Sequence, residues 1–164
     1  MSSEYEEFMN SQTKQPKKVK SGSKIFEKAS YSKLNSKQKE NYNFHRLASL
    51  LASFGFNSIW LNDDIHGADL LALSTEGDVF KIQLKGRLTF DKKYLNKNLY
   101  MAFPDNGGFY IYPHDLALKS FIKRFEQTTS WIEKGQYSMK LVTNADSKHI
   151  SDYFFDENSD LITF

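Results

Sequence analysis

The chain of 164 residues contains no cysteine, which excludes disulfide bonds and thiolate chemistry. No apolar run approaches the roughly 18 residues that a membrane helix needs. The first residues, 1–10, are acidic and polar and lack the basic head and apolar middle of a signal peptide. We therefore expect a cytoplasmic protein with no membrane partner.

Several common catalytic signatures are also missing. There is no Gly-x-Ser-x-Gly nucleophile turn, no glycine-rich phosphate loop and no pair of histidines at zinc-ligand spacing. His45 and His66 stand apart from any such pattern. These absences exclude the usual serine hydrolases and P-loop enzymes, and we expect no organic cofactor.

The net charge of +2 is too small to identify a nucleic-acid-binding protein, but the charge is unevenly distributed. Glu27 is the only acid in the lysine-rich residues 14–39, and Asp91 is the only acid among the basic residues 81–97. Two basic segments on a nearly neutral chain are suited to follow a phosphate backbone.

With 40% hydrophobic and 15% aromatic residues, the chain is long enough for one domain with a real core. Residues 1–30 are rich in serine, lysine and glutamine and poor in aliphatics, which predicts a flexible lysine-rich leader. Residues 31–164 are expected to form a single domain. The leader is either a solubilising tail or an arm that lies along a nucleic-acid backbone.

The pattern becomes helical from Asn35. Apolar residues then recur every three or four positions, and Gly55 supplies a stop, so the spacing predicts a helix over 36–54. A strand over 57–61 and a polar loop over 62–66 follow. The apolar residues of the helix are Phe44, Leu47, Leu50, Leu51 and Phe54.

Two apolar strands carry polar residues where a sheet normally buries carbon. They span about 67–74 and 78–85 and are joined by Thr75-Glu76-Gly77. In the second strand Gln83 and Lys85 share the face opposite to that of Phe80, Ile82 and Leu84.

The length of the connecting loop decides where Asp69 points. A three-residue loop with Gly77 at positive φ pairs Ser74 with Asp78 and sets Asp69 opposite Gln83. A two-residue loop would instead set Asp69 opposite Leu84 and turn it away. We favour the former, because Gly77 stands where that turn needs positive φ.

The rest of the chain predicts further elements, so that the order from the helix at 36–54 onward is α-β-β-β-loop-β-β-α, with no internal repeat. His114-Asp115 follows Pro113 and is interpreted as a helix start, because adjacent side chains do not easily point at each other. The remaining elements are strands at 99–103 and 108–112 around the turn 104–107, helices at 115–126, 130–134 and 147–155, and a strand at 139–142.

Asp69, Gln83 and Lys85 together suit a metal-assisted phosphodiester cleavage. A strand carboxylate and a side-chain carbonyl are hard oxygen ligands, and a neighbouring main-chain carbonyl can add a third. A lysine two residues on can serve the attacking water or offset charge on the phosphorane. Taken singly, Asp69 is also suited to cap a turn, Gln83 to be an exposed strand residue, and Lys85 to be a solvated edge lysine.

From residue 38 to residue 118, this arrangement resembles the PD-(D/E)XK nuclease superfamily, which includes restriction endonucleases and Holliday-junction resolvases. The resemblance rests on the helix ending at Gly55, on Gly67-Ala68-Asp69 and on Gln83-Leu84-Lys85. It implies an α/β fold with a restriction-endonuclease-like αβββαβ core, a central mixed sheet flanked by helices. It also implies a Mg²⁺-dependent endonuclease acting on DNA, in which Mn²⁺ can substitute, with Asp69 and Gln83 as metal ligands and Lys85 as the catalytic lysine.

Two departures from the family pattern bear on the metal site. Gln83 stands where glutamate is usual, which leaves the site short of negative charge, so another acid is required. Glu40 in the first helix and Asp64 in the polar loop are the two candidates. The helix position that ordinarily carries the family's glutamate holds Phe44.

The expected partner is DNA, contacted by Arg87, Lys92, Lys93 and Lys97, with Tyr94 or Tyr100 stacking on a base or sugar. A homodimer is expected, because many enzymes of this type cut two strands. The alternative is a nuclease-like fold that has lost cleavage and binds nucleic acid or a protein partner. A domain unconnected to nucleic acid is a third possibility.

Overall fold

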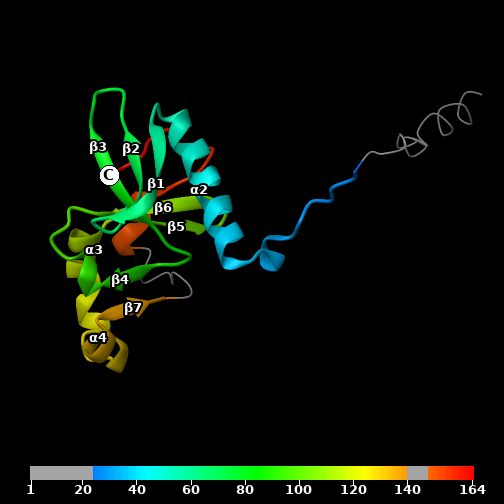
Figure 1. Ribbon diagram of the computed structural model, residues 1–164. Helices are drawn as coiled ribbons and strands as arrows, with labels where there is room; N and C mark the ends of the chain where they lie inside the picture. The colour runs from blue at the N-terminus through cyan, green and yellow to red at the C-terminus, as the bar shows by residue number, and fades with distance from the viewer. Residues whose placement is uncertain (1–23, 140–147) are drawn as a thin grey trace, which may run out of the picture. The chain divides into compact units, whose positions relative to one another are not determined.

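The computed structural model describes residues 24–139 and 148–164, except the side chains of residues 64 and 65 (Figure 1). Two compact units divide the chain, one ending at Lys33 and the other running from Leu34 to Phe164. In the first unit the described residues are exposed and include one 3-10 turn, η1 (Tyr31–Lys33). Most of the expected leader therefore lies outside the described residues.

Helix α2 (Ser36–Ser53) opens the second unit, and the prediction of a helix over 36–54 is confirmed. Its start is closed by a capping box in which Asn35 Oδ1 accepts from the Gln38 amide at 2.8 Å, and Gln38 Oε1 accepts from the Asn35 amide at 2.9 Å. Leu47 and Leu51 are fully buried. The helix is thus held by its own cap and by one apolar stripe.

A six-stranded mixed sheet forms the centre of this unit. Its order is β1-β2-β3-β5-β6-β8, in which β3 and β5 are parallel and every other neighbouring pair is antiparallel. The α/β class with a central mixed sheet and helices is therefore confirmed. The strands are β1 (Asn57–Ile65), β2 (Ala68–Leu73), β3 (Val79–Leu84), β5 (Tyr100–Asp105), β6 (Gly108–Pro113) and β8 (Phe154–Phe155).

The hairpin of β2 and β3 has the register that the three-residue loop predicts. Leu73 pairs with Val79 and Leu70 with Ile82. The Ser74 amide donates to the Asp78 carbonyl at 2.9 Å, and Gly77 has φ +96°. The alternative two-residue loop is thereby excluded.

The predicted polar loop over 62–66 is wrong. Strand β1 continues to Ile65, which pairs with Ala68 beyond a bulge that begins after Trp60. The reversal needs only His66 and Gly67, both at positive φ, 58° and 91°. Polar residues in this stretch sit in an irregular edge strand rather than in a loop.

The connection between β3 and β5 differs from the αβββαβ order. Residues 85–99 hold the short strand β4 (Thr89–Asp91) and the 3-10 turn η2 (Lys92–Tyr94), and no α-helix. Strand β4 forms a separate two-stranded sheet with β7 (Gln136–Ser138). The sequence prediction had assigned no structure to 89–91, because three residues carry too little pattern to identify a strand.

The later helices agree only in part with the predictions, and α3 is shorter than expected. α3 (His114–Phe121) ends in the 3-10 turn η3 (Ile122–Arg124), and α4 (Thr129–Lys134) matches the predicted helix at 130–134. The strand predicted at 139–142 lies mostly outside the described residues. The helix predicted at 147–155 is only partly correct, because η4 (Ser151–Tyr153) gives way to β8. No helix in the described ranges is long and apolar enough to cross a membrane.

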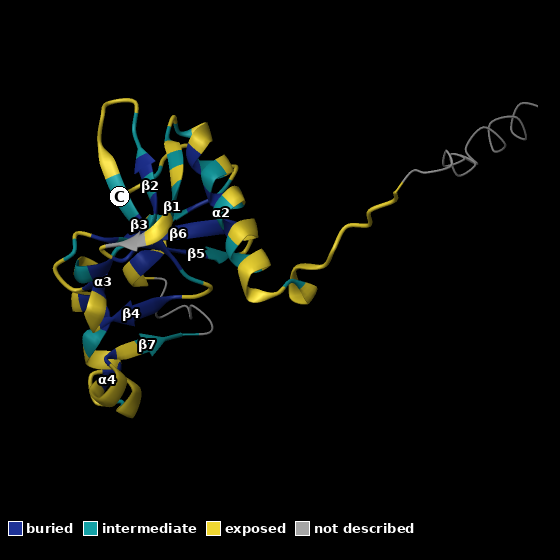
Figure 2. Cartoon of the chain, in the orientation of Figure 1, coloured by how far each residue is buried: buried dark blue, intermediate teal, exposed yellow. Residues whose placement is uncertain are grey.

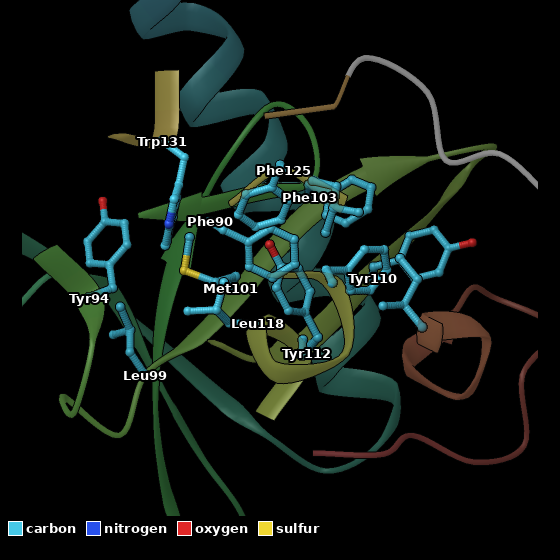
Figure 3. Packing of buried hydrophobic residues seen from close by; sticks show 14 of the residues in the cluster. Phe90, Tyr94, Leu99, Met101, Phe103, Tyr110, Tyr112, Leu118, Phe125 and Trp131 are labelled. Carbon is cyan, nitrogen blue, oxygen red and sulfur yellow. The ribbon is translucent and has the colours of Figure 1, made fainter. Parts of the chain in front are cut away.

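Each face of the sheet packs against its own layer, so the central strands are buried on both sides (Figure 2). α2 covers the face of Leu70, Ile82 and Leu84. The other face carries an aromatic cluster to which β4, α3 and α4 contribute, and ten of its side chains are labelled in Figure 3. Members of this cluster include Phe90, Tyr94, Leu99, Met101, Phe103, Tyr112, Phe121, Phe125 and Trp131.

Tyr112 fixes β4 to the sheet from within this cluster. Its hydroxyl donates to the Thr89 carbonyl at 2.7 Å and accepts from the Thr89 amide at 3.2 Å. Burial raises the pKa of this hydroxyl, which keeps it protonated and able to donate. The segment that carries residues 85–99 is therefore anchored at its middle.

Replacing Gly108 with alanine is expected to destabilise the protein by about 1–3 kcal/mol or more. A Cβ at this position would stand 2.4 Å from the Phe155 carbonyl oxygen, so β8 would have to move away from β6. Gly86→Ala is the matched control, because nothing lies within 4 Å of its Cβ position. Urea unfolding measures both free energies, and equal values would contradict the prediction.

Candidate metal and nuclease site

The structure brings Asp69 and Gln83 together on the sheet face opposite α2. The β2–β3 register sets them across from each other, and Gln83 Nε2 donates to Asp69 Oδ2. The same carboxylate oxygen accepts from the Leu84 amide at 2.8 Å. Asp69 is half-buried and Gln83 is buried, so the carboxylate is held by two donors at the end of the hairpin.

The amide of Gln83 is held at both ends. Its nitrogen lies between Asp69 Oδ2 and the Leu84 carbonyl oxygen, which is 3.3 Å away. Its oxygen accepts from the Tyr94 hydroxyl at 3.0 Å. The side chain therefore has a fixed position between the hairpin and the β3–β5 connection.

Lys85 continues directly from this arrangement. Its amide donates to the Ala102 carbonyl at 2.7 Å, which extends the parallel pairing of β3 with β5 by one residue. Its half-buried side chain places Nζ 5.3 Å from the centre of the Tyr94 ring. The predicted trio thus gathers at one place, with Tyr94 touching two of its members.

The stacking role expected for Tyr94 requires an exposed ring, and the structure buries it. Only 2% of the residue is exposed. The ring packs so closely on Gly67 that a Cβ there would be 3.0 Å from Tyr94 Cδ1, and it contacts the His114 ring edge-on at 5.8 Å. Figure 3 shows Tyr94 beside Leu99 at one end of the aromatic cluster. Tyr94 supports the site from beneath instead of contacting a base. Tyr100 packs mainly against Phe80 and Phe164.

The basic residues predicted to contact DNA take different positions. Lys92 Nζ lies 5.1 Å from the Trp131 ring, and Lys93 Nζ lies 4.8 Å from the Tyr94 ring and 4.0 Å from Asp91 Oδ2. Lys97 supplies its carbonyl oxygen to Lys81 Nζ. Arg87 is exposed at the rim of a hollow between β4, β7 and α4. These four remain candidates for backbone contacts, since each keeps a cationic head at or near the surface.

The two candidate acids, Glu40 and Asp64, lie in different places relative to Asp69. Glu40 pairs with Lys37 at 3.1 Å, and it continues the stripe of Phe44, Leu47 and Leu51 that faces the opposite side of the sheet. The structure therefore does not bring Glu40 to Asp69. Asp64 lies in β1 near the turn that leads to Asp69, and its side chain is outside the described part of the structure.

His114 and Asp115 begin α3, as predicted, but their side chains also interact directly, which the sequence interpretation did not expect. Asp115 Oδ1 lies 2.8 Å from His114 Nδ1, and Asp115 Oδ2 accepts from the Asn96 amide at 2.8 Å. His114 is 1% exposed, and its Nε2 accepts from the Asp91 amide at 3.2 Å. The pair supports the η2 segment and so the seat of Tyr94. No catalytic role follows from this geometry.

The residues at this place fit a hard divalent cation once the Gln83 amide is turned over. In the structure, the Gln83 amide nitrogen faces Asp69 Oδ2 and the Leu84 carbonyl oxygen. A half-turn of the amide group exchanges its nitrogen and oxygen, so that the oxygens of Asp69, Gln83 and Leu84 would all be directed at one point. The Tyr94 hydroxyl can accept as well as donate, so it suits both orientations. Across residues 24–139 and 148–164, no three side chains of histidine, cysteine, aspartate or glutamate are grouped to hold a metal.

Sequence reasoning missed the contribution of Tyr94 to Gln83 and that of His114 to the loop beneath it. One signal was present, since Tyr94 is an aromatic residue in a lysine-rich segment that also holds Leu95 and Leu99. Such a residue can be a buried anchor as easily as a surface one. The choice between the two depends on the tertiary fold.

Replacing Tyr94 with phenylalanine is expected to cost about 1–2 kcal/mol of stability, because the Gln83 amide loses a buried partner. Tyr110→Phe is the matched control: Tyr110 is 8% exposed in the same cluster, and its hydroxyl has no hydrogen bond within the described ranges. Chemical unfolding of both variants tests this. A loss equal to that of the control would show that the Tyr94 hydroxyl contributes only packing.

No protein-family model matches this chain, and no curated protein matches it. The geometry of Asp69, Gln83, Lys85 and Tyr94 is therefore the basis on which a function can be inferred.

Proposed function

We propose that this protein is a metal-dependent endonuclease that hydrolyses phosphodiester bonds in DNA, with Mg²⁺ as its ion and Mn²⁺ as a substitute. One observation carries the proposal: the Asp69 carboxylate, the Gln83 amide and the Leu84 carbonyl meet at the end of β3, with Lys85 following immediately. Hard oxygens are the ligands of the ion in metal-assisted cleavage of a phosphodiester, and a neighbouring amine can serve the attacking water or the developing charge.

Each side chain has a distinct task in this proposal. Asp69 supplies the negative charge, and Gln83 and the Leu84 carbonyl supply neutral oxygens that complete one side of the ion. The ion, when bound, supplies Lewis-acid polarisation of the phosphate. Lys85 orients the attacking water or stabilises charge on the phosphorane, and its seat over the Tyr94 ring keeps the amine on that side.

The restriction-endonuclease-like core belongs to this proposal as well. Support comes from α2, the β1–β2–β3 meander and the parallel pairing of β3 with β5, which bring the predicted trio together. The αβββαβ core has a helix between its third and fourth strands. In this protein β4 and η2 occupy that position between β3 and β5. We extend the proposal to a homodimer, since one copy offers one such site and a duplex has two strands.

Incubation with supercoiled plasmid tests the proposal. We expect nicked and linear DNA with Mg²⁺ or Mn²⁺, and neither with EDTA. Linear product that appears together with nicked product indicates that two copies act in one encounter, and sedimentation of the protein alone checks the dimer. Intact plasmid under every metal condition would contradict the nuclease.

A second candidate is favoured by one observation. Among the described residues, no three side chains of histidine, cysteine, aspartate or glutamate are grouped to hold a metal, and Asp69 is the carboxylate seen against Gln83, which is little charge for a Mg²⁺ ligand set. A nuclease-like fold that binds DNA without cutting is therefore the alternative. Retention of DNA on a gel at low salt, with no nicking in Mg²⁺ or Mn²⁺, supports this alternative.

A further inference from the structure

A polar hollow of about 360 Å³ lies between α4 and the β4–β7 sheet. None of the described residues that line it is acidic. Its lining consists of Arg87, Ser130, Lys134, Gln136, Tyr137 and Ser138. A concave surface with two cations, three hydroxyls and an amide offers hydrogen-bond donors on several sides.

The walls of this hollow are fixed by contacts within the fold. Thr89 pairs with Ser138 across the two strands, and their side-chain oxygens lie 3.0 Å apart. Ser130 Oγ donates to the Gln136 carbonyl at 2.6 Å. The Tyr137 ring stacks on Phe125 with the ring centres 4.4 Å apart. The Ser130 and Ser138 hydroxyls thus donate within the fold, and the donors left for a ligand are those of Arg87, Lys134, Gln136 and Tyr137 on a preformed surface.

The two cations of the hollow lack acidic partners. Arg87 and Lys134 are both exposed, and the ion pairs among the described residues involve neither of them. Other basic side chains of the 81–97 segment are already placed on protein groups, Lys92 over Trp131 and Lys93 beside Asp91. Two uncompensated cations on one hollow raise the local positive potential and attract an anion.

The chain links this hollow to the candidate site. Arg87 follows Lys85 by two residues, so their Cα atoms are at most about 7 Å apart. Successive nucleotides of one strand advance about 3.4 Å along the helix axis. A strand whose phosphodiester lies at Lys85 therefore has a further phosphate within reach of Arg87.

We propose that the hollow is a binding subsite for one backbone phosphate of DNA, held jointly by Arg87 and Lys134. The subsite rests on the proposed nuclease function and names how that function holds its substrate strand. Lys134 is recruited from α4 by the pairing of β4 with β7. Because the contact is to phosphate, it fixes the position of the strand and reads no sequence.

The test is the salt dependence of binding to a short fluorescein-labelled duplex, measured by anisotropy in Ca²⁺ or EDTA. We expect Arg87→Gln and Lys134→Gln each to weaken binding roughly tenfold. The double variant should lower the slope of log K against log salt by about 0.9, the value for a single phosphate. A slope lowered by about 1.8 would mean two separate phosphates and overturn the shared subsite.

Lys119→Gln combined with Lys123→Gln is the matched control, since it removes two exposed charges outside the hollow. An equal effect in the control would show that the loss of net charge alone weakens binding, and would overturn the proposal.

In plasmid cutting, the Arg87 and Lys134 double variant should raise KM and leave kcat unchanged. A wild-type protein that binds the duplex while the double variant binds identically overturns the subsite alone. A wild-type protein that binds no DNA at low salt overturns the proposed function itself.

Discussion

Replacing Lys85 with methionine is expected to reduce Mg²⁺-dependent nicking by about 10²–10⁴-fold, the range for loss of a positioned acid–base group. Methionine keeps the length and packing of the side chain over Tyr94 and removes only the amine. The backbone bond from Lys85 to the Ala102 carbonyl is unaffected, so the fold should persist. Initial rates of plasmid nicking at saturating DNA measure the effect, with thermal unfolding as the check on folding.

Two further variants sharpen this experiment. Lys119→Met removes an exposed lysine on α3 and should cut at the wild-type rate. Lys85→Arg restores a cation that cannot give up its proton. Recovery of activity in Lys85→Arg would assign Lys85 to charge stabilisation, and no recovery would assign it to proton transfer. Nicking by Lys85→Met within a few fold of wild type would remove Lys85 from the mechanism.

Replacing Asp69 with asparagine is expected to abolish Mg²⁺ binding at this site and, with it, cutting. The variant keeps an oxygen that can accept from the Leu84 amide at the present 2.8 Å, so the hairpin should remain folded. It removes the negative charge of Asp69, the carboxylate that contacts Gln83 and Leu84. Loss of even an outer partner of a metal ligand costs about 10–100-fold in affinity, and loss of the charged ligand should exceed that.

Thermal unfolding with and without Mg²⁺ measures this binding without any substrate. An ion that binds only the folded protein stabilises it by about 2.7 kcal/mol at a hundredfold excess over Kd. Wild-type protein should gain that stability and Asp69→Asn should not. Asp78→Asn, at the other end of the same hairpin, is the matched control and should respond like wild type. Equal stabilisation of Asp69→Asn would place any bound ion elsewhere.

The hairpin shows how far local patterns reach. Successive side chains of β3 point to opposite faces of the sheet, which places Gln83 and Lys85 on the face away from Ile82 and Leu84. Gly77 at positive φ fixes the length of the loop. A single-residue slip would have turned Asp69 to the other face. The contact of Asp69 with Gln83 was therefore predictable before any tertiary structure.

Other predictions were incomplete or wrong where a residue's structure depends on a partner that is distant in the sequence. A polar loop was predicted over 62–66, yet β1 continues to Ile65, which pairs with Ala68 beyond the bulge. His114 and Asp115 begin α3 as predicted, but their contacts with each other and with the amides of Asp91 and Asn96 were not expected. Glu40 had a suitable place in the sequence, but α2 covers the other face of the sheet.

The amino-acid sequence alone determined α2, the β2–β3 hairpin and the meeting of Asp69 with Gln83, because periodicity and turn chemistry act over a few residues. The tertiary structure alone decided that Tyr94 is buried beneath Gln83 and that Lys134 joins Arg87 at one hollow. The approach of Lys134 to Arg87 depends on the pairing of β4 with β7. This pairing brings together Thr89 and Ser138, which are 49 residues apart. Contacts of that span arise from packing around a shared core, which no local pattern encodes.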